Sequence, residues 1–86
     1  MQITRTDKFK KAYQRLPAHE QERAKKAILF LAADMRHPSL QVKEIKGTGD
    51  IWEARVSLGI RMTFSLDGSA VVVRNVGEHD ATLNNP

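Results

Sequence analysis

The spacing of the apolar side chains changes once along this chain, from a helical period to a period of two. Up to Met35 the apolar residues recur every three or four positions, as they do on one face of a helix. From Ile51 onward apolar and polar residues alternate, which is typical of half-buried strands. Helices followed by a run of strands predict an α+β fold in which a helical hairpin packs on one face of a twisted antiparallel sheet.

Capping residues and helix breakers predict where the elements begin and end. Residues 1–4 read as a short strand, Thr6 or Asp7 suits the N-cap of a first helix, and Leu16-Pro17 ends that helix. A second helix extends to Met35. Residues 36–50 contain a proline and two glycines, so we expect a loop there with a short strand at its centre. The predicted order is β-α-α-β-β-β in a single domain, residues 1–86.

Composition narrows the class of protein. A chain of 86 residues with 41% hydrophobic content can bury one modest core. Cysteine is absent, which excludes a disulfide framework and a thiolate nucleophile. The longest apolar run, residues 27–33, is far shorter than the ~20 residues that span a bilayer. We therefore expect a soluble, cytoplasmic protein.

Charge is distributed unevenly along the chain. Residues 1–46 hold eleven Lys and Arg against five Asp and Glu, whereas residues 47–86 hold three against five. A basic first half predicts binding to a polyanion or to an acidic partner, although a solvated, lysine-rich helix surface explains the same charge equally well.

The register of the predicted hairpins places arginines side by side. A three-residue loop, Ser57-Leu58-Gly59 with Gly59 in a left-handed conformation, keeps both strands on matching faces and pairs Arg55 with Arg61. A two-residue loop at Asp67-Gly68 would then pair Arg61 with Arg74. The prediction is a row of three arginines across three strands, on the face that the helices leave open.

A row of like charges on a sheet is destabilising unless an anion relieves it. Guanidinium groups are always charged and bind phosphate oxygens in pairs, so the row predicts a phosphate site. The alternative is that the arginine stems only cover apolar sheet surface while their charged ends reach water. The last strand ends beside Gly59, which should bring His79 close to Arg61, where an imidazole can exchange a proton with a reacting phosphate.

Three ordered motifs resemble the RelE/ParE superfamily of bacterial toxins, and its RelE-like mRNA interferase branch in particular. They are "WEARV" and "RMTF" within "IWEARVSLGIRMTF", and "VGEHD" within "VVVRNVGEHDATL", preceded by a similar "HPSL" loop. The resemblance covers nearly the whole chain. It implies the toxin of a type II toxin-antitoxin pair, a metal-independent endoribonuclease without cofactors that cuts mRNA on the ribosome and is bound by a cognate antitoxin.

Site residues carry over from the family position by position. Arg61 matches the arginine that contacts the scissile phosphate, His79 matches a catalytic histidine or arginine, and Arg55 matches a basic or histidine position. Lys43 and Lys46 fall near lysines that contact the RNA backbone. Arg74 matches no catalytic position, and only the register argument assigns it to RNA binding.

Two alternatives remain open at this point. Many nucleolytic members of the family carry an aromatic residue near the C-terminus, where this chain reads Leu83-Asn84-Asn85. A ParE-like toxin that inhibits DNA gyrase by protein binding, and an inactive toxin-like domain that only binds a partner, are both compatible with the same fold. The three histidines are too scattered to predict a metal site.

Overall fold

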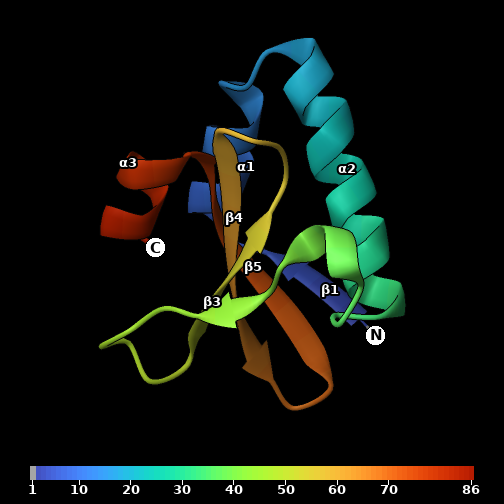
Figure 1. The fold of residues 1–86 in the computed structure, drawn as a ribbon, viewed down its shortest axis with the longest axis vertical. Helices are drawn as coiled ribbons and strands as arrows, with labels where there is room; N and C mark the ends of the chain where they lie inside the picture. The colour runs from blue at the N-terminus through green and yellow to red at the C-terminus, as the bar shows by residue number, and fades with distance from the viewer. Residues whose placement is uncertain (1) are drawn as a thin grey trace.

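The structure is a computed structural model that describes residues 2–86. Its elements follow the predicted order, with two additions, η1 and α3 (Figure 1). In chain order they are β1 (Gln2–Arg5), α1 (Asp7–Gln14), α2 (Ala18–Ala33), the 3-10 helix η1 (Pro38–Leu40), β2 (Lys43–Glu44), β3 (Ile51–Arg55), β4 (Ile60–Asp67), β5 (Ala70–Glu78) and α3 (His79–Asn84). The predicted first strand is confirmed at Gln2–Arg5, and Met1 lies outside the described residues. The short strand expected in the loop is β2.

The five strands form one sheet in the order β1-β5-β4-β3-β2. The pairs β2-β3, β3-β4 and β4-β5 are antiparallel, as predicted. The pair β1-β5 is parallel, so the sheet is mixed and the prediction of a purely antiparallel sheet is wrong at this edge. β1 and β2 lie at opposite edges of the sheet, so β1 does not form a hairpin with the strand that follows it in the chain, and α1 and α2 connect the two edges.

The predicted helical hairpin is confirmed, and it covers one face of the sheet. The buried face of α2 packs with Phe9 of α1 on the apolar face of β4 and β5, in a core that includes Leu31, Met62, Phe64 and Val73. Thr6 is the N-cap of α1, and its Oγ1 accepts a hydrogen bond from the Phe9 backbone N–H at 3.1 Å. The same hydroxyl donates to the Arg74 carbonyl oxygen at 3.0 Å, which ties the start of α1 to β5.

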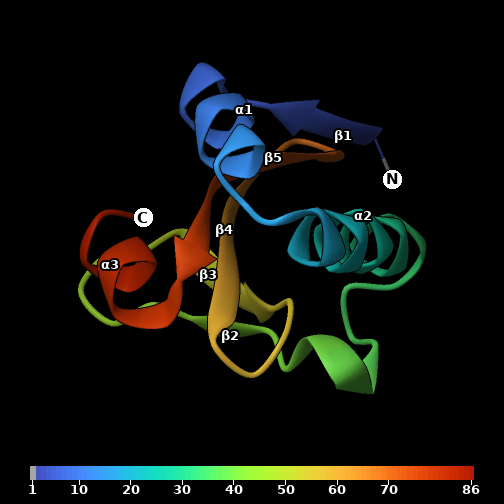
Figure 2. The same cartoon turned by 90° about the horizontal axis from the view of Figure 1, so that it is seen from above.

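The second face of the sheet is not fully open, in contrast to the prediction. Figure 2 shows α2 and α3 on opposite sides of β4. Glu78 caps α3, because its Oε2 accepts a hydrogen bond from the Ala81 backbone N–H at 2.9 Å. Thr82 of this helix is buried against the sheet. Among residues 2–86, no helix has the length and apolar character needed to cross a bilayer.

The close approach of α3 to the sheet depends on Gly77. A Cβ atom added at Gly77 would lie 3.0 Å from Thr82 Oγ1, which is tighter than ordinary van der Waals contact. We expect Gly77→Ala to lower the free energy of unfolding by about 1–3 kcal/mol, because overpacking displaces the helix or the strand. Urea denaturation of both variants measures it, with Gly59→Ala as the control, since a Cβ at Gly59 meets nothing within 4 Å. Equal unfolding midpoints for the two variants would contradict this packing.

A candidate phosphate-binding and catalytic site

The first hairpin has the predicted strand register. Arg55 lies opposite Arg61, and Glu53 lies opposite Thr63. The backbone N–H groups of Val56 and Ser57 both donate to the Ile60 carbonyl oxygen, at 3.0 and 3.2 Å. Val56 and Ser57 therefore both lie opposite Ile60, and this bulge closes the hairpin without a left-handed glycine. The left-handed conformation predicted for Gly59 is wrong, because the glycines with positive φ are Gly47, Gly49 and Gly68.

The second hairpin differs from the prediction, and the difference removes the row of three arginines. Asp67 pairs with Ala70, so the two-residue loop is Gly68-Ser69, and Gly68 supplies the positive φ of 60°. The register then shifts between Phe64 and Thr63, which pair with Val73 and Asn75. Arg74 is the extra residue of this β-bulge, and the residue opposite Arg61 is Gly77.

The bulge in β5 allows three valines of this strand to be buried in the core. Val71, Val73 and Val76 are all buried. Strict alternation would direct Val76 away from Val71 and Val73, and one extra residue between them restores all three to the same face. The bulged Arg74 donates from Nε to the Pro86 carbonyl oxygen at 3.4 Å, beside the C-terminus. Its assignment to RNA binding stays a prediction that the register no longer supports.

Arg61 is held against the loop between β3 and β4. Its Nη1 donates to the carbonyl oxygens of Ser57 at 2.8 Å, Leu58 at 3.2 Å and Ile60 at 3.2 Å. Its Nε lies 3.9 Å from Oε1 of Glu53, and only 15% of the side-chain surface is exposed. A guanidinium fixed at this many points has lost most of its rotational freedom, so it is preorganised to bind an anion.

Glu53 belongs to the site although the sequence did not predict it there. Its side chain is 8% exposed and lies on the polar face of β3, between Lys43 of β2 and Thr63 of β4. A carboxylate this buried needs a cation, and Arg61 supplies it. In the described part of the chain, the hydroxyl of Thr63 is buried without a hydrogen-bond partner. The sequence did contain a signal, an acidic residue paired by register with the strand that carries Arg61.

His79 begins α3 beside the same loop, as predicted. Its backbone N–H donates to the Gly59 carbonyl oxygen at 2.9 Å, and Glu78 pairs with Ile60. The side chain is 43% exposed, and its Nδ1 lies 2.9 Å from Oδ1 of Asp80. A carboxylate at this distance favours the proton on Nδ1, which leaves the lone pair of a neutral imidazole on Nε2. Arg61 and His79 are thus anchored to successive carbonyl oxygens of one loop, residues 57–60.

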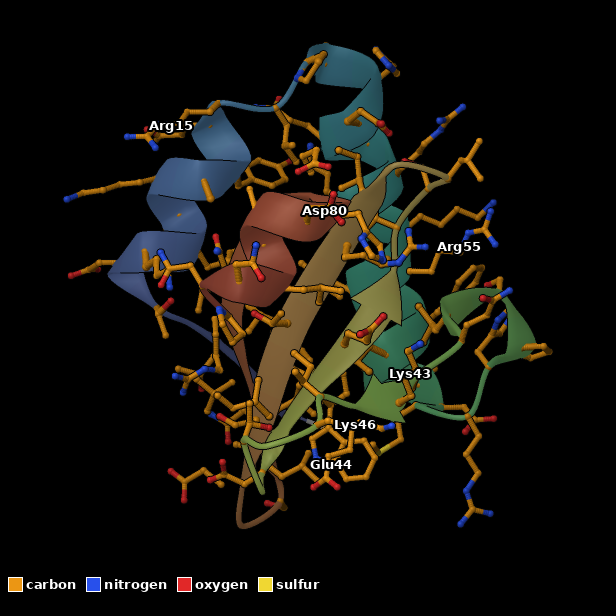
Figure 3. The ribbon with its side chains drawn as sticks, turned by 60° about the vertical axis from the view of Figure 1, so that its left-hand side comes forward. Arg15, Lys43, Glu44, Lys46, Arg55 and Asp80 are labelled. Atoms are coloured by element: carbon orange, nitrogen blue, oxygen red, sulfur yellow. The ribbon has the colours of Figure 1, made fainter. Side chains whose placement is uncertain are left out.

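The remaining predicted residues lie along one flank of the sheet. In Figure 3, Arg55, Lys43 and Lys46 follow one another from top to bottom of the molecule, with Asp80 above them near the start of α3. Lys43 is exposed and pairs with Glu53 in the register. Lys46 is exposed in the turn that follows β2. Arg55, at the end of β3, lines a cavity with side chains of α2. The register therefore brings Lys43 close to Glu53, and it places neither Lys46 nor Arg74 beside Arg61.

The arrangement has the groups needed for acid-base chemistry on an anionic substrate. It combines a fixed guanidinium with a partly exposed imidazole whose orientation a carboxylate supports. Within residues 2–86, no three His, Cys, Asp or Glu side chains gather closely enough to hold a metal ion.

Comparison with solved structures identifies the fold. The chain is similar to the YoeB/ParE toxin from Agrobacterium tumefaciens, with a TM-score of 0.78 and 20% identity over 92% of this chain and 99% of that one. It is also similar to a chain of the RelB-RelE antitoxin-toxin complex from Methanococcus jannaschii, with a TM-score of 0.77 and 20% identity over 96% and 99% of the two chains. YafQ from E. coli matches with a TM-score of 0.78 and 12% identity, over 93% and 94%.

Comparison of the sequence alone finds no relative. No protein-family model matches the chain, and no curated protein matches it significantly. The chain therefore has the fold of the RelE/ParE toxins, as its motifs predicted.

Proposed function

We propose that this chain, which has the RelE/ParE toxin fold, is the toxin of a type II toxin-antitoxin pair and acts as a metal-independent endoribonuclease on mRNA. The observation that carries the proposal is the joint anchoring of Arg61 and His79 on the loop of residues 57–60, with Glu53 and Asp80 beside them. Without a metal ion, a guanidinium can stabilise the charge on the phosphoryl oxygens and an oriented imidazole can transfer a proton during phosphodiester cleavage.

The proposed reaction is an internal transesterification of RNA. The 2′-oxygen attacks the adjacent phosphorus, the bond from phosphorus to the 5′-oxygen breaks, and the products end in a 2′,3′-cyclic phosphate and a 5′-hydroxyl. The proton of the 2′-hydroxyl leaves to a base, and the 5′-oxygen takes up a proton. Nε2 of His79 serves one of these transfers, and water serves the other.

Arg61 stabilises the charge that develops on the phosphoryl oxygens. The loop and Glu53 engage its Nη1 and Nε, and Nη2 is the remaining donor group for a phosphate oxygen. Lys43 and Arg55 add positive charge on the adjoining flank, where the flanking RNA backbone binds. One positioned acid or base contributes about 10²–10⁴-fold to a rate, so positioning of the mRNA by the ribosome supplies part of the acceleration. Cleavage of mRNA during translation inhibits protein synthesis.

A toxin of this type requires a partner that neutralises it. The RelB-RelE and DinJ-YafQ structures to which this chain is similar are antitoxin-toxin complexes. On this chain, Lys10, Arg5 and Lys25 surround a groove of about 380 Å³ between the two helices, and Phe9, Tyr13 and Ile28 also line it. Apolar and cationic groups together fit an acidic, amphipathic segment that folds on binding. We therefore infer a cognate antitoxin as the partner.

The proposal is tested by adding the purified protein to a translating extract and mapping the new ends of the mRNA. We expect cuts within translated codons, with 2′,3′-cyclic phosphates at the 3′ ends of the upstream fragments. A phosphatase that does not open cyclic phosphates distinguishes these ends from 3′-monophosphates. Intact mRNA in an extract that continues to translate would contradict the proposal, and inhibition of DNA supercoiling by gyrase in a parallel assay would then favour a ParE-like toxin.

A further inference from the structure

A cavity of about 250 Å³ lies between α2, η1 and the end of β3, on the flank of the candidate site. Buried Ala27 and Leu40 contribute to its lining, and exposed Arg23 and Lys26 of α2 stand at its opening. Arg55 lines it from the sheet. Although Arg55 is the register partner of Arg61, its side chain borders this cavity and is not among the contacts of the Arg61 guanidinium.

The three cations face the cavity without an acidic residue among its described lining side chains. Glu20 contacts two of the lining residues, and its Oε2 accepts a hydrogen bond from Ser57 Oγ at 3.0 Å. Its Oε1 lies 3.5 Å from Nη1 of Arg23, and the Arg23 side chain is 58% exposed. The Glu20 side chain is only 14% exposed, but the Arg23 end of the pair faces solvent. The contact engages Nη1 alone, so the other guanidinium donors of Arg23 are available to an anionic ligand.

Lys26 lines the cavity beside a stacked pair of aromatic rings. Its Nζ lies 5.6 Å from the centre of the Phe30 ring. The His37 ring stacks on Phe30 with a centroid distance of 4.0 Å and an interplanar angle of 5°. His37 is itself fixed, because its Nδ1 accepts a hydrogen bond from the Ser39 backbone N–H at 3.2 Å. A cation–π contact thus joins the ammonium group to a Phe30-His37 pair that bridges α2 and the start of η1.

We propose that this cavity is a phosphate subsite for single-stranded RNA, which binds the backbone next to the phosphodiester that reacts at Arg61 and His79. The inference rests on the proposed ribonuclease function and deepens it. Arg55 connects the two sites, because β3 and β4 pair it with Arg61 while its side chain borders the cavity with Arg23 and Lys26. Three cations from two distant segments, α2 and β3, border one cavity, which fits the continuous negative charge of an RNA backbone.

The test is RNA binding measured separately from cleavage. The probe is a fluorescent single-stranded RNA oligonucleotide in which 2′-O-methyl groups replace the attacking hydroxyls, so it binds but cannot be cut. Affinity is measured by fluorescence anisotropy over a range of salt concentrations. The variants are Lys26→Gln and the double variant Arg23→Gln/Lys26→Gln. The matched control is Lys25→Gln, which removes the same charge from the adjacent residue of α2. Lys25 does not line this cavity and instead lines the groove between α1 and α2, together with Arg5.

We expect the double variant to bind the probe at least 10-fold more weakly than the wild type. The slope of log affinity against log salt should decrease by about 0.7 for each phosphate contact that is lost. Lys25→Gln should change the affinity by less than half as much as Lys26→Gln. Equal losses for the two single variants, or no loss in the double variant, would overturn the subsite. A wild-type protein that binds the probe in this pattern but leaves natural mRNA intact would retain the subsite and refute the ribonuclease function.

Discussion

Replacing His79 with alanine is expected to lower the rate of mRNA cleavage by about 10²–10⁴-fold, the contribution of one positioned acid or base. The side chain is partly exposed and contacts Asp80, whereas the hydrogen bond that anchors α3 to Gly59 comes from the backbone N–H of His79. The substitution therefore removes the imidazole and leaves that anchor in place. Cleavage is measured as the amount of cut mRNA against time in the translating extract.

His19 supplies a matched control for this experiment. It is exposed on α2, and it is not among the residues that contact the loop of residues 57–60. His19→Ala should cleave mRNA at the wild-type rate. If His79→Ala cleaves as fast as His19→Ala, His79 is not the acid or base of this reaction.

Arg61→Lys is expected to lower cleavage by about 10²–10³-fold, comparable to removal of one oxyanion donor from an enzyme. Lysine keeps the positive charge beside Glu53. It lacks the planar guanidinium, which lets Arg61 contact three loop carbonyl oxygens and still offer a donor to phosphate. Alanine is a poorer test, because it would leave the buried Glu53 carboxylate without a cation, at a cost of about 3–5 kcal/mol in stability.

A double variant separates catalysis from folding at this position. Glu53→Gln/Arg61→Gln removes both charges of the buried pair, so neither is left uncompensated, and the amides retain polar groups at both positions. We expect the double variant to unfold cooperatively in urea and to cleave as slowly as Arg61→Lys or more slowly. Glu53→Gln alone should keep much of the activity, since Arg61 remains bound to the loop. Wild-type cleavage by the double variant would exclude Arg61 from the chemistry.

The two hairpins show which strand registers a pattern of apolar residues can predict and which it cannot. The alternation of apolar and polar residues placed Arg55 opposite Arg61 correctly, because a shift of one residue would have moved Val56 and Met62 to opposite faces. The same alternation does not distinguish Asp67-Gly68 from Gly68-Ser69 as the turn in the next hairpin. The two registers differ by two residues, so they place the same side chains on the same faces. The error moved Arg74 into a row that does not exist.

The sequence by itself determined the helical hairpin, the strand order along the chain, the first hairpin register and the position of His79 beside Gly59. Each depends on local periodicity, on a cap such as Thr6 or on a short turn, which act within a few residues. Only the tertiary structure decided the parallel pairing of β1 with β5, the bulge at Arg74, the packing of α3 over Gly77 and the side-chain direction of Arg55. These depend on which groups distant segments bury against one another, so no local pattern specifies them.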